Sequence, residues 1–372
     1  MEIEYIETFP LLYELSEPYG DANGYKKYRS CFLFKITTND GIHGWGECID
    51  WLPTIEKGFN ERIIPYLIGK KATDRTQIVK VVKKWNKRAA SGISMALTEI
   101  VAKSAGLSVC ELWGGKIRES IQVYASFQSY SQDKNWVNHS LQLIDQTISK
   151  GFDQIKIKIG GRTLQEDFSH IQAIQSMLEE KIYLALDANQ SYDFSTARKW
   201  ERYFKKWQNF LWFEEPIPIE QISDYKLLRG NISIPIAGGE NLTSTVQFLP
   251  LLINGAVDII QPDIMHENGV HEYLETLHLS RSFGLRSSPH TFDGPLSRLY
   301  ALFAQACLPP WSKMEKDDIE PIEWDVMDNP FTSLVSIQPN NGCLMVPDGI
   351  GIGTEIDIEL MEKYRWDGRI YH

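Results

Sequence analysis

Beyond about residue 121, this 372-residue chain repeats a short strand, a turn and a helix. Eight short strand candidates recur at intervals of about 27 residues, which is the length of one strand–helix unit. The runs are IQVYASF, FDQIKIKIG, IYLALDA, FLWFEEP, IPIAGGE, VDIIQPD, GLRSSPH and EPIEW. Thr163-x-x-Glu166 is a capping box that predicts the start of one intervening helix. This alternation favours a (β/α) barrel, with a doubly wound parallel sheet as the competing arrangement.

The first third of the chain has a different pattern. Residues 30–47 alternate on both sides of Asn39-Asp40-Gly41, which predicts a β-hairpin, and the stretch from Thr76 to Leu107 is helical in pattern. We therefore expect an α+β domain over residues 1–120 and a barrel over residues 121–340. Residues 341–372 lose the alternation, and we expect them to return to the first domain.

Composition excludes several classes of function. The chain has 43% hydrophobic and 23% charged residues, which are the proportions of a globular protein, and its net charge of −11 disfavours nucleic acid as a partner. Its five cysteines form no C-x-x-C pair, which argues against a zinc knuckle or a disulfide framework. No apolar run reaches membrane-spanning length, and the acidic amino terminus does not read as a signal peptide. We expect a cytoplasmic protein that acts on a small molecule.

Polar side chains end consecutive strand candidates. Asp187, Glu214, Glu240, Asp263 and His290 are separated by 27, 26, 23 and 27 residues, so each lies one unit after the last. A single acid after a strand can be a helix N-cap, but five polar groups in phase are difficult to explain in that way. The carboxyl ends of barrel strands surround one mouth, where the carboxylates would repel one another without a cation. Oxygen ligands without cysteine favour magnesium over zinc.

The second strand candidate carries two lysines on one face. Lys156 and Lys158 alternate with three isoleucines that can pack on helices, which leaves the lysines toward the barrel interior. With Cα atoms about 6–7 Å apart, repulsion of roughly 2–3 kcal/mol would lower one lysine pKa by about two units. One lysine could then act as a base near neutral pH. The alternative is an exposed edge strand with two solvated lysines.

These motifs together resemble a known family. Lys-x-Lys, Asp-x-Asn, Glu-Glu-Pro, Gly-Glu-Asn, Gln-Pro-Asp and Pro-His occur in the order and spacing of the enolase superfamily, specifically its mandelate racemase subgroup. DGIHGWGE and SGISMALTEIVAKSAGLSVCELWGG are similar to the family's amino-terminal segments. The resemblance implies a modified TIM barrel, (β/α)7β, that binds Mg²⁺ under an α+β capping domain built from both termini.

The resemblance also implies roles for individual residues. Asp187, Glu214 and Glu240 correspond to the metal ligands. Lys158 corresponds to the base on one face of the substrate, and Lys156 to the cation beside the substrate carboxylate.

The remaining roles concern the opposite face of the substrate. Asp263 and His290 resemble the opposed dyad, in which the aspartate orients the imidazole. Asn189 resembles a hydrogen-bond donor to the carboxylate. Glu323 resembles the last-strand acid, with Glu315 as a competitor because it lies closer to the usual spacing.

The implied chemistry is removal of the proton next to a carboxylate. Elimination of a neighbouring hydroxyl would make the protein an acid-sugar dehydratase, whereas return of a proton to the other face would make it a racemase or epimerase. The segment Glu17–Arg29 is polar and is expected to be a loop, which favours a polyhydroxylated substrate and hence the dehydratase. A protein that only binds a sugar acid is the remote alternative. We also expect a homo-oligomer.

Overall fold

Eight parallel strands form one curved sheet in the computed structural model, which describes residues 1–179, 181–292, 294–314 and 318–371. The strands are β4 (Ser120–Ser126), β6 (Gln154–Lys158), β7 (Tyr183–Asp187), β8 (Phe210–Glu214), β9 (Ile236–Gly238), β10 (Ile259–Ile260), β11 (Arg286–Ser287) and β12 (Ile322–Asp325). Their hydrogen-bonded order is β11-β10-β9-β8-β7-β6-β4-β12. Successive strands are neighbours with no reversal of direction along the order, which a doubly wound sheet would require. The predicted barrel is confirmed.

Side chains join the two ends of this sheet. Among the described residues, the backbone ladder does not pair β11 with β12. Instead, Ser288 Oγ donates to the Pro321 carbonyl at 2.7 Å. Gln305 Nε2 donates to the carbonyls of Ser287 at 3.0 Å and Glu320 at 2.8 Å. These bonds close the barrel where its strands are shortest.

In the described part of the chain, a helical connection leads from each of the first seven barrel strands to the next strand, and β12 is the last strand of the barrel, which gives the (β/α)7β pattern. The connections contain α6 (Trp136–Ser149), α7 (Leu164–Met177), α8 (Phe194–Ala197) with η2 (Arg198–Trp200) and α9 (Glu201–Phe204), α10 (Ile222–Arg229), α11 (Thr245–Asn254), α12 (Val270–Ser282) and α13 (Pro295–Cys307). The capping box of α7 is confirmed, because Thr163 and Glu166 each accept a hydrogen bond from the other's backbone N–H. No helix in the described ranges is long and apolar enough to cross a membrane.

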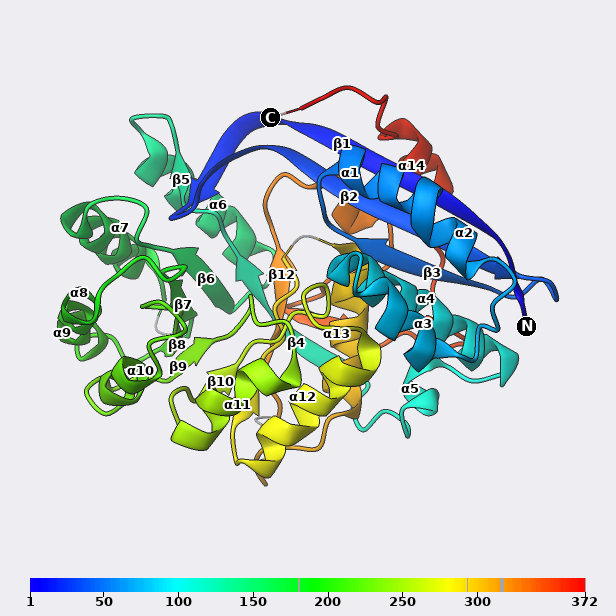
Figure 1. The fold of residues 1–372 in the computed structure, drawn as a ribbon. Helices are drawn as coiled ribbons and strands as arrows, with labels where there is room; N and C mark the ends of the chain where they lie inside the picture. The colour runs from blue at the N-terminus through cyan, green and yellow to red at the C-terminus, as the bar shows by residue number, and fades with distance from the viewer. Residues whose placement is uncertain (180, 293, 315–317, 372) are drawn as a thin grey trace.

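The capping domain is an antiparallel sheet with helices, and it lies over the barrel (Figure 1). The sheet has the order β3-β2-β1-β5, so the first barrel connection adds a strand to it. Its strands are β1 (Ile3–Asp21), β2 (Gly24–Thr38), β3 (His43–Cys48) and β5 (Tyr130–Ser131), and its helices are α1 (Leu52–Gly58), η1 (Phe59–Ile63), α2 (Ile64–Leu67), α3 (Arg75–Val82), α4 (Lys87–Ser104) and α5 (Val109–Leu112). The hairpin predicted at Asn39-Asp40-Gly41 is the β2–β3 turn.

One expectation for the cap was wrong. The segment Glu17–Arg29 is not a loop, because β1 and β2 remain paired as far as Asp21 and Gly24. Its polar residues lie on a paired ribbon in which β1 also pairs with β5, so the backbone groups are satisfied within the sheet. The helical pattern from Thr76 to Leu107 is confirmed and consists of two helices, α3 and α4, because Asn86 caps a new helix by accepting from the Ala89 N–H at 2.9 Å.

The last residues contact both parts of the molecule. After η3 (Pro330–Ser333), β13 (Cys343–Met345) pairs antiparallel with β4. The chain then reaches α14 (Ile358–Lys363), which lies beside the long cap strands in Figure 1. There the Leu12 N–H donates to the Tyr364 carbonyl, and the Trp366 N–H donates to the Pro10 carbonyl. The carboxyl-terminal segment therefore adds to the cap that the amino-terminal segment begins.

Glu47 fastens the cap to the barrel. Its buried carboxylate, on β3, accepts the N–H groups of Leu296 at 2.6 Å and Ser297 at 3.2 Å, at the start of α13. A Cβ on Gly294 would lie 1.7 Å from Glu47 Oε1, so only glycine leaves room for this contact. Burial raises the pKa of Glu47 to about 7.

Glu47→Ala should lower the free energy of unfolding by about 2–3 kcal/mol, because two buried N–H groups lose a charged acceptor. Glu47→Gln keeps one acceptor oxygen, so its free energy of unfolding should fall by clearly less than that of Glu47→Ala. Urea unfolding followed by circular dichroism measures both variants. Equal stability of the alanine and glutamine variants would show that the contact does not hold the two domains together.

Candidate active site

Three carboxylates converge at the carboxyl ends of neighbouring barrel strands. Asp187 is the last residue of β7, Glu214 is the last residue of β8, and Glu240 follows β9 by two residues. One oxygen from each lies within 4.8 Å of the others, and all three residues are buried. The strand-end spacing therefore brings these acids together, as the barrel geometry predicts.

The chemistry of this triad fits a divalent cation. Burial, together with the charge of Asp187, raises the pKa of Glu214 to about 7, because a buried carboxylate beside a second carboxylate is unfavourable when it is charged. Glu240 Oε2 is buried and accepts no hydrogen bond from the described residues. The triad offers oxygen ligands only, which is the donor set that magnesium prefers.

Both lysines of β6 point into the barrel, as predicted. Lys156 Nζ lies 2.7 Å from Glu214 Oε1 and 3.0 Å from Glu323 Oε1, and Lys158 Nζ pairs with Asp187 Oδ2. The expectation of a lowered lysine pKa was wrong in this arrangement. Burial favours the neutral amine, but the surrounding carboxylates outweigh it and hold the pKa of each lysine above its ordinary value.

Asp263 and His290 form a hydrogen-bonded pair. His290 Nδ1 lies 2.7 Å from Asp263 Oδ2, while Nε2 lies 3.4 Å from Glu240 Oε2. The aspartate therefore fixes the ring with Nε2 toward the triad. Burial opposes the imidazolium, but the carboxylates of Glu240, Glu323 and Asp263 outweigh burial and raise the pKa of His290 to about 10.

The last barrel strand contributes an acid to the same cluster. Glu323 is buried on β12, where its Oε2 accepts the Thr291 N–H at 3.1 Å and lies 3.5 Å from His290 Nε2. Its competitor, Glu315, lies outside the described residues. Asn189 is held beside the triad by its backbone N–H, which donates to Asp187 Oδ1 at 2.9 Å.

Sequence reasoning missed two side chains that orient Glu214. Trp212 Nε1 and Gln261 Nε2 both donate to Glu214 Oε2 at 2.7 Å. Trp212 stands two residues before Glu214 on β8, so the strand period could have placed both on the inner face. The neighbouring acid, Glu215, turns away from the triad and accepts from the Gly239 N–H and the Gln190 amide.

A cavity of about 320 Å³ opens onto these groups beneath the tip of the β1–β2 hairpin. Lys158, Asn189 and His290 line its barrel side, and Asn23 and Lys26 line its cap side. The cavity is therefore walled by polar and charged groups from both domains.

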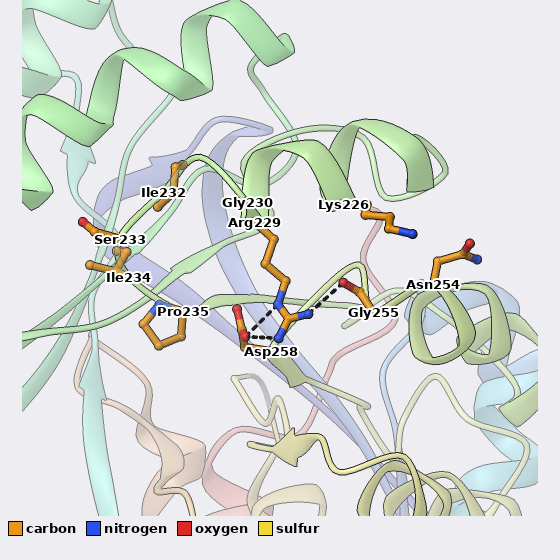
Figure 2. Close-up of a pocket in the computed structure, with 10 residues that line it drawn as sticks. All are labelled: Lys226, Arg229, Gly230, Ile232, Ser233, Ile234, Pro235, Asn254, Gly255 and Asp258. Carbon is orange, nitrogen blue, oxygen red and sulfur yellow. Dashed lines mark hydrogen bonds and ion pairs between the residues drawn. The ribbon is translucent and has the colours of Figure 1, made fainter.

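A second cavity lies beside the amino ends of β9 and β10. Figure 2 shows Arg229 in it, with its guanidinium held by the Asp258 carboxylate and the Gly255 carbonyl. The Arg229 guanidinium is already paired, and this cavity shares no lining residue with the triad. The convergent reactive groups therefore mark the carboxyl ends of the strands as the candidate active site.

Two family descriptions match the chain. Residues 8–114 match the mandelate racemase / muconate lactonizing enzyme N-terminal domain, and residues 140–360 match the enolase C-terminal domain-like family. The chain belongs to the mandelate racemase and muconate lactonizing enzyme family. The resemblance inferred from the motifs is confirmed, and this enolase-superfamily member is an enzyme of the lyase or isomerase type.

Individual relatives of this superfamily member span nearly its whole length. It is 30% identical to D-galactarolactone cycloisomerase of Agrobacterium fabrum, over 98% of this chain and 99% of that protein. It is also 30% identical to arabinonate dehydratase of Saccharolobus solfataricus, with the same coverage. The structure of 3,6-anhydro-D-galactonate cycloisomerase from Zobellia galactanivorans superposes with a TM-score of 0.83 at 28% identity, covering 99% of this chain and 100% of that one.

Proposed function

We propose that this enzyme removes the proton α to the carboxylate of an acid sugar and then eliminates a group from the β-carbon. The observation that carries the proposal is the presence of two proton-transfer groups that face one cavity from different strands. Lys158 projects from β6 and His290 follows β11, while the strands of the triad lie between them in the barrel order. A substrate carbon held there would have a proton-transfer group on either face.

The carboxylate triad is proposed to hold Mg²⁺. Bound there, the cation would supply positive charge to the substrate carboxylate as negative charge develops on it. Lys156 would add a second positive charge, because it lies buried among Glu214 and Glu323 with no room to move away. Asn189 would donate to the same carboxylate, and Glu323 would orient Lys156 and His290.

The β-elimination needs a general acid, and His290 is the group proposed for that role. With Asp263 behind Nδ1, its Nε2 points toward the triad and would deliver a proton to the leaving oxygen. If a hydroxyl leaves, the product has lost water and the enzyme is a dehydratase. If the oxygen of a lactone or anhydro ring leaves, the ring opens without loss of atoms and the enzyme is a cycloisomerase.

The two outcomes are supported by different observations. The polar hairpin tip and the dehydratase relative favour loss of water from an open-chain acid sugar. The two cycloisomerase relatives favour the ring-opening form of the same step. A racemase or epimerase would use the same two bases without a leaving group, and a protein that only binds sugar acids would not need two opposed bases.

Incubation with a panel of acid sugars and their lactones in deuterium oxide with Mg²⁺ should give 2-keto-3-deoxy acids. Mass spectrometry distinguishes the outcomes, because dehydration lowers the mass by one water and ring opening leaves the composition unchanged apart from deuterium. Proton NMR would reveal α-proton exchange with inversion if the enzyme is a racemase. Absence of exchange and of keto acid across the panel would exclude all these activities and leave the binding-only function.

The same proposal includes the setting of the enzyme. We propose a homo-oligomer in the cytoplasm that acts on small carboxylates and not on nucleic acid, since the net charge is −11. Light scattering measures the oligomer, and cell fractionation tests the location.

A further inference from the structure

A cavity of about 430 Å³ separates the cap from the barrel, away from the candidate active site. Helices α3, α4 and α5 form its cap wall, and the first turns of α12 form its barrel wall. It shares no lining residue with the cavity beneath the hairpin tip. Its volume falls in the range of small-molecule sites, which is about 300–1,000 Å³.

Much of the lining is apolar. Val79 of α3, Leu112 and Trp113 at the end of α5, and Val270 and Leu274 of α12 face the cavity. Trp113 packs against Tyr300 with ring centroids 5.9 Å apart, so one edge of the cavity rests on an aromatic cluster. A sugar would leave its hydroxyls unpaired against these side chains, whereas an aromatic or aliphatic group would be buried favourably.

The remaining lining is polar and carries an excess of positive charge, and its neutral polar residues are Thr76, Ser94, Thr98 and Asn268. Arg75, Lys80 and Lys83 of the cap line the cavity together with His271. Arg75 is half-buried, and its NH1 makes a 3.4 Å contact with Thr98 Oγ1. Among the described residues, no carboxylate forms an ion pair with these three cations.

One acidic residue, Glu272, also lines the cavity. Its Oε1 accepts a hydrogen bond from the Thr245 N–H of α11 at 3.3 Å, so the carboxylate is engaged on that side. Glu272 therefore does not serve as the counter-ion of Arg75. A half-buried guanidinium without a partner carboxylate is suited to bind one in a bidentate manner.

We propose that this cavity is a binding site for an amphipathic organic anion. The ligand has a single carboxylate that binds Arg75, and an aromatic or short aliphatic body that packs against Val79, Trp113 and Leu274. Such a ligand bridges α3 of the cap and α12 of the barrel.

Isothermal titration calorimetry of the Mg²⁺-loaded protein with 4-phenylbutyrate tests the proposal. The neutral analogue 4-phenylbutan-1-ol has the same body, and butyrate has the carboxylate without the ring. We expect 4-phenylbutyrate to bind about tenfold more tightly than either analogue, because it alone satisfies both halves of the site. Arg75→Gln should remove the advantage of the acid over the alcohol.

Two further variants locate the site. Lys84→Gln removes a positive charge from an exposed residue that does not line the cavity, and it should leave binding unchanged. Val79→Trp fills the apolar part of the cavity and should weaken the binding of both phenyl compounds. This variant tests the site if Arg75→Gln does not fold. Equal affinity for acid and alcohol, equal effects of Arg75→Gln and Lys84→Gln, or displacement of 4-phenylbutyrate by an acid sugar would overturn the proposal.

Discussion

Asp187→Asn should abolish turnover and weaken magnesium binding by at least about tenfold. The change removes one of three charges from a buried triad, and a neutral amide oxygen is a much poorer ligand for a hard cation. It also removes the carboxylate that pairs with Lys158, so the lysine proposed as a base loses the partner that positions it. Calorimetric titration with Mg²⁺ measures the affinity, and keto-acid formation measures the turnover.

Asp193→Asn is the matched control for this variant. This substitution makes the same change of charge at the N-cap of α8, away from the triad. There the Asp193 carboxylate accepts a hydrogen bond from the Thr196 N–H at 2.6 Å. This variant should bind magnesium as the natural protein does. If Asp187→Asn shows the same magnesium affinity as Asp193→Asn, the triad is not the metal site.

His290→Asn should lower kcat by about 10²- to 10⁴-fold with little change in KM, as expected when a group acts in proton transfer and not in binding. Asparagine cannot take up or release a proton at the position of the imidazole Nε2. Lys158→Ala should abolish deuterium exchange only for the isomer whose α-proton faces β6. Exchange followed by proton NMR measures the effect of each base separately.

His139→Asn provides the control for the histidine variant, because His139 is exposed on α6 and is not one of the residues of the carboxylate, lysine and histidine cluster. It should leave both rate and exchange unchanged. Near-normal kcat in His290→Asn would mean that another residue supplies the acid. Loss of exchange for both isomers in Lys158→Ala would mean that the lysine acts through charge and not as the base of one face.

Local periodicity was sufficient to predict the scaffold of the site. Along QIKIK, alternation places the isoleucines against helices and both lysines inside, and the structure has this arrangement. The one-unit spacing of Asp187, Glu214 and Glu240 similarly brings the three acids to one mouth. Both features follow from the geometry of a single strand or a single unit, which the sequence specifies without knowledge of distant contacts.

Charge balance within the site could not be predicted in the same way. Two adjacent lysines on one strand indicate mutual repulsion and a lowered pKa, but carboxylates from β7, β8 and β12 reverse the direction of that shift. One of the two donors that orient Glu214 is Gln261, which follows the end of β10. These effects depend on which strands become neighbours, so they appear only once the barrel has closed.

The sequence by itself determined the family, the barrel, the identity of the clustered acids and the inward face of the lysines. Only the tertiary structure decided that the polar segment Glu17–Arg29 is a paired ribbon above the site and that Glu47 joins the cap to α13. It also decided that Arg75 faces a cavity in which no carboxylate of the described residues pairs with it. Periodicity and spacing act between residues close in the chain. Ion pairing, closure and cavities arise between residues far apart in the chain, because their energies depend on distance and burial in space.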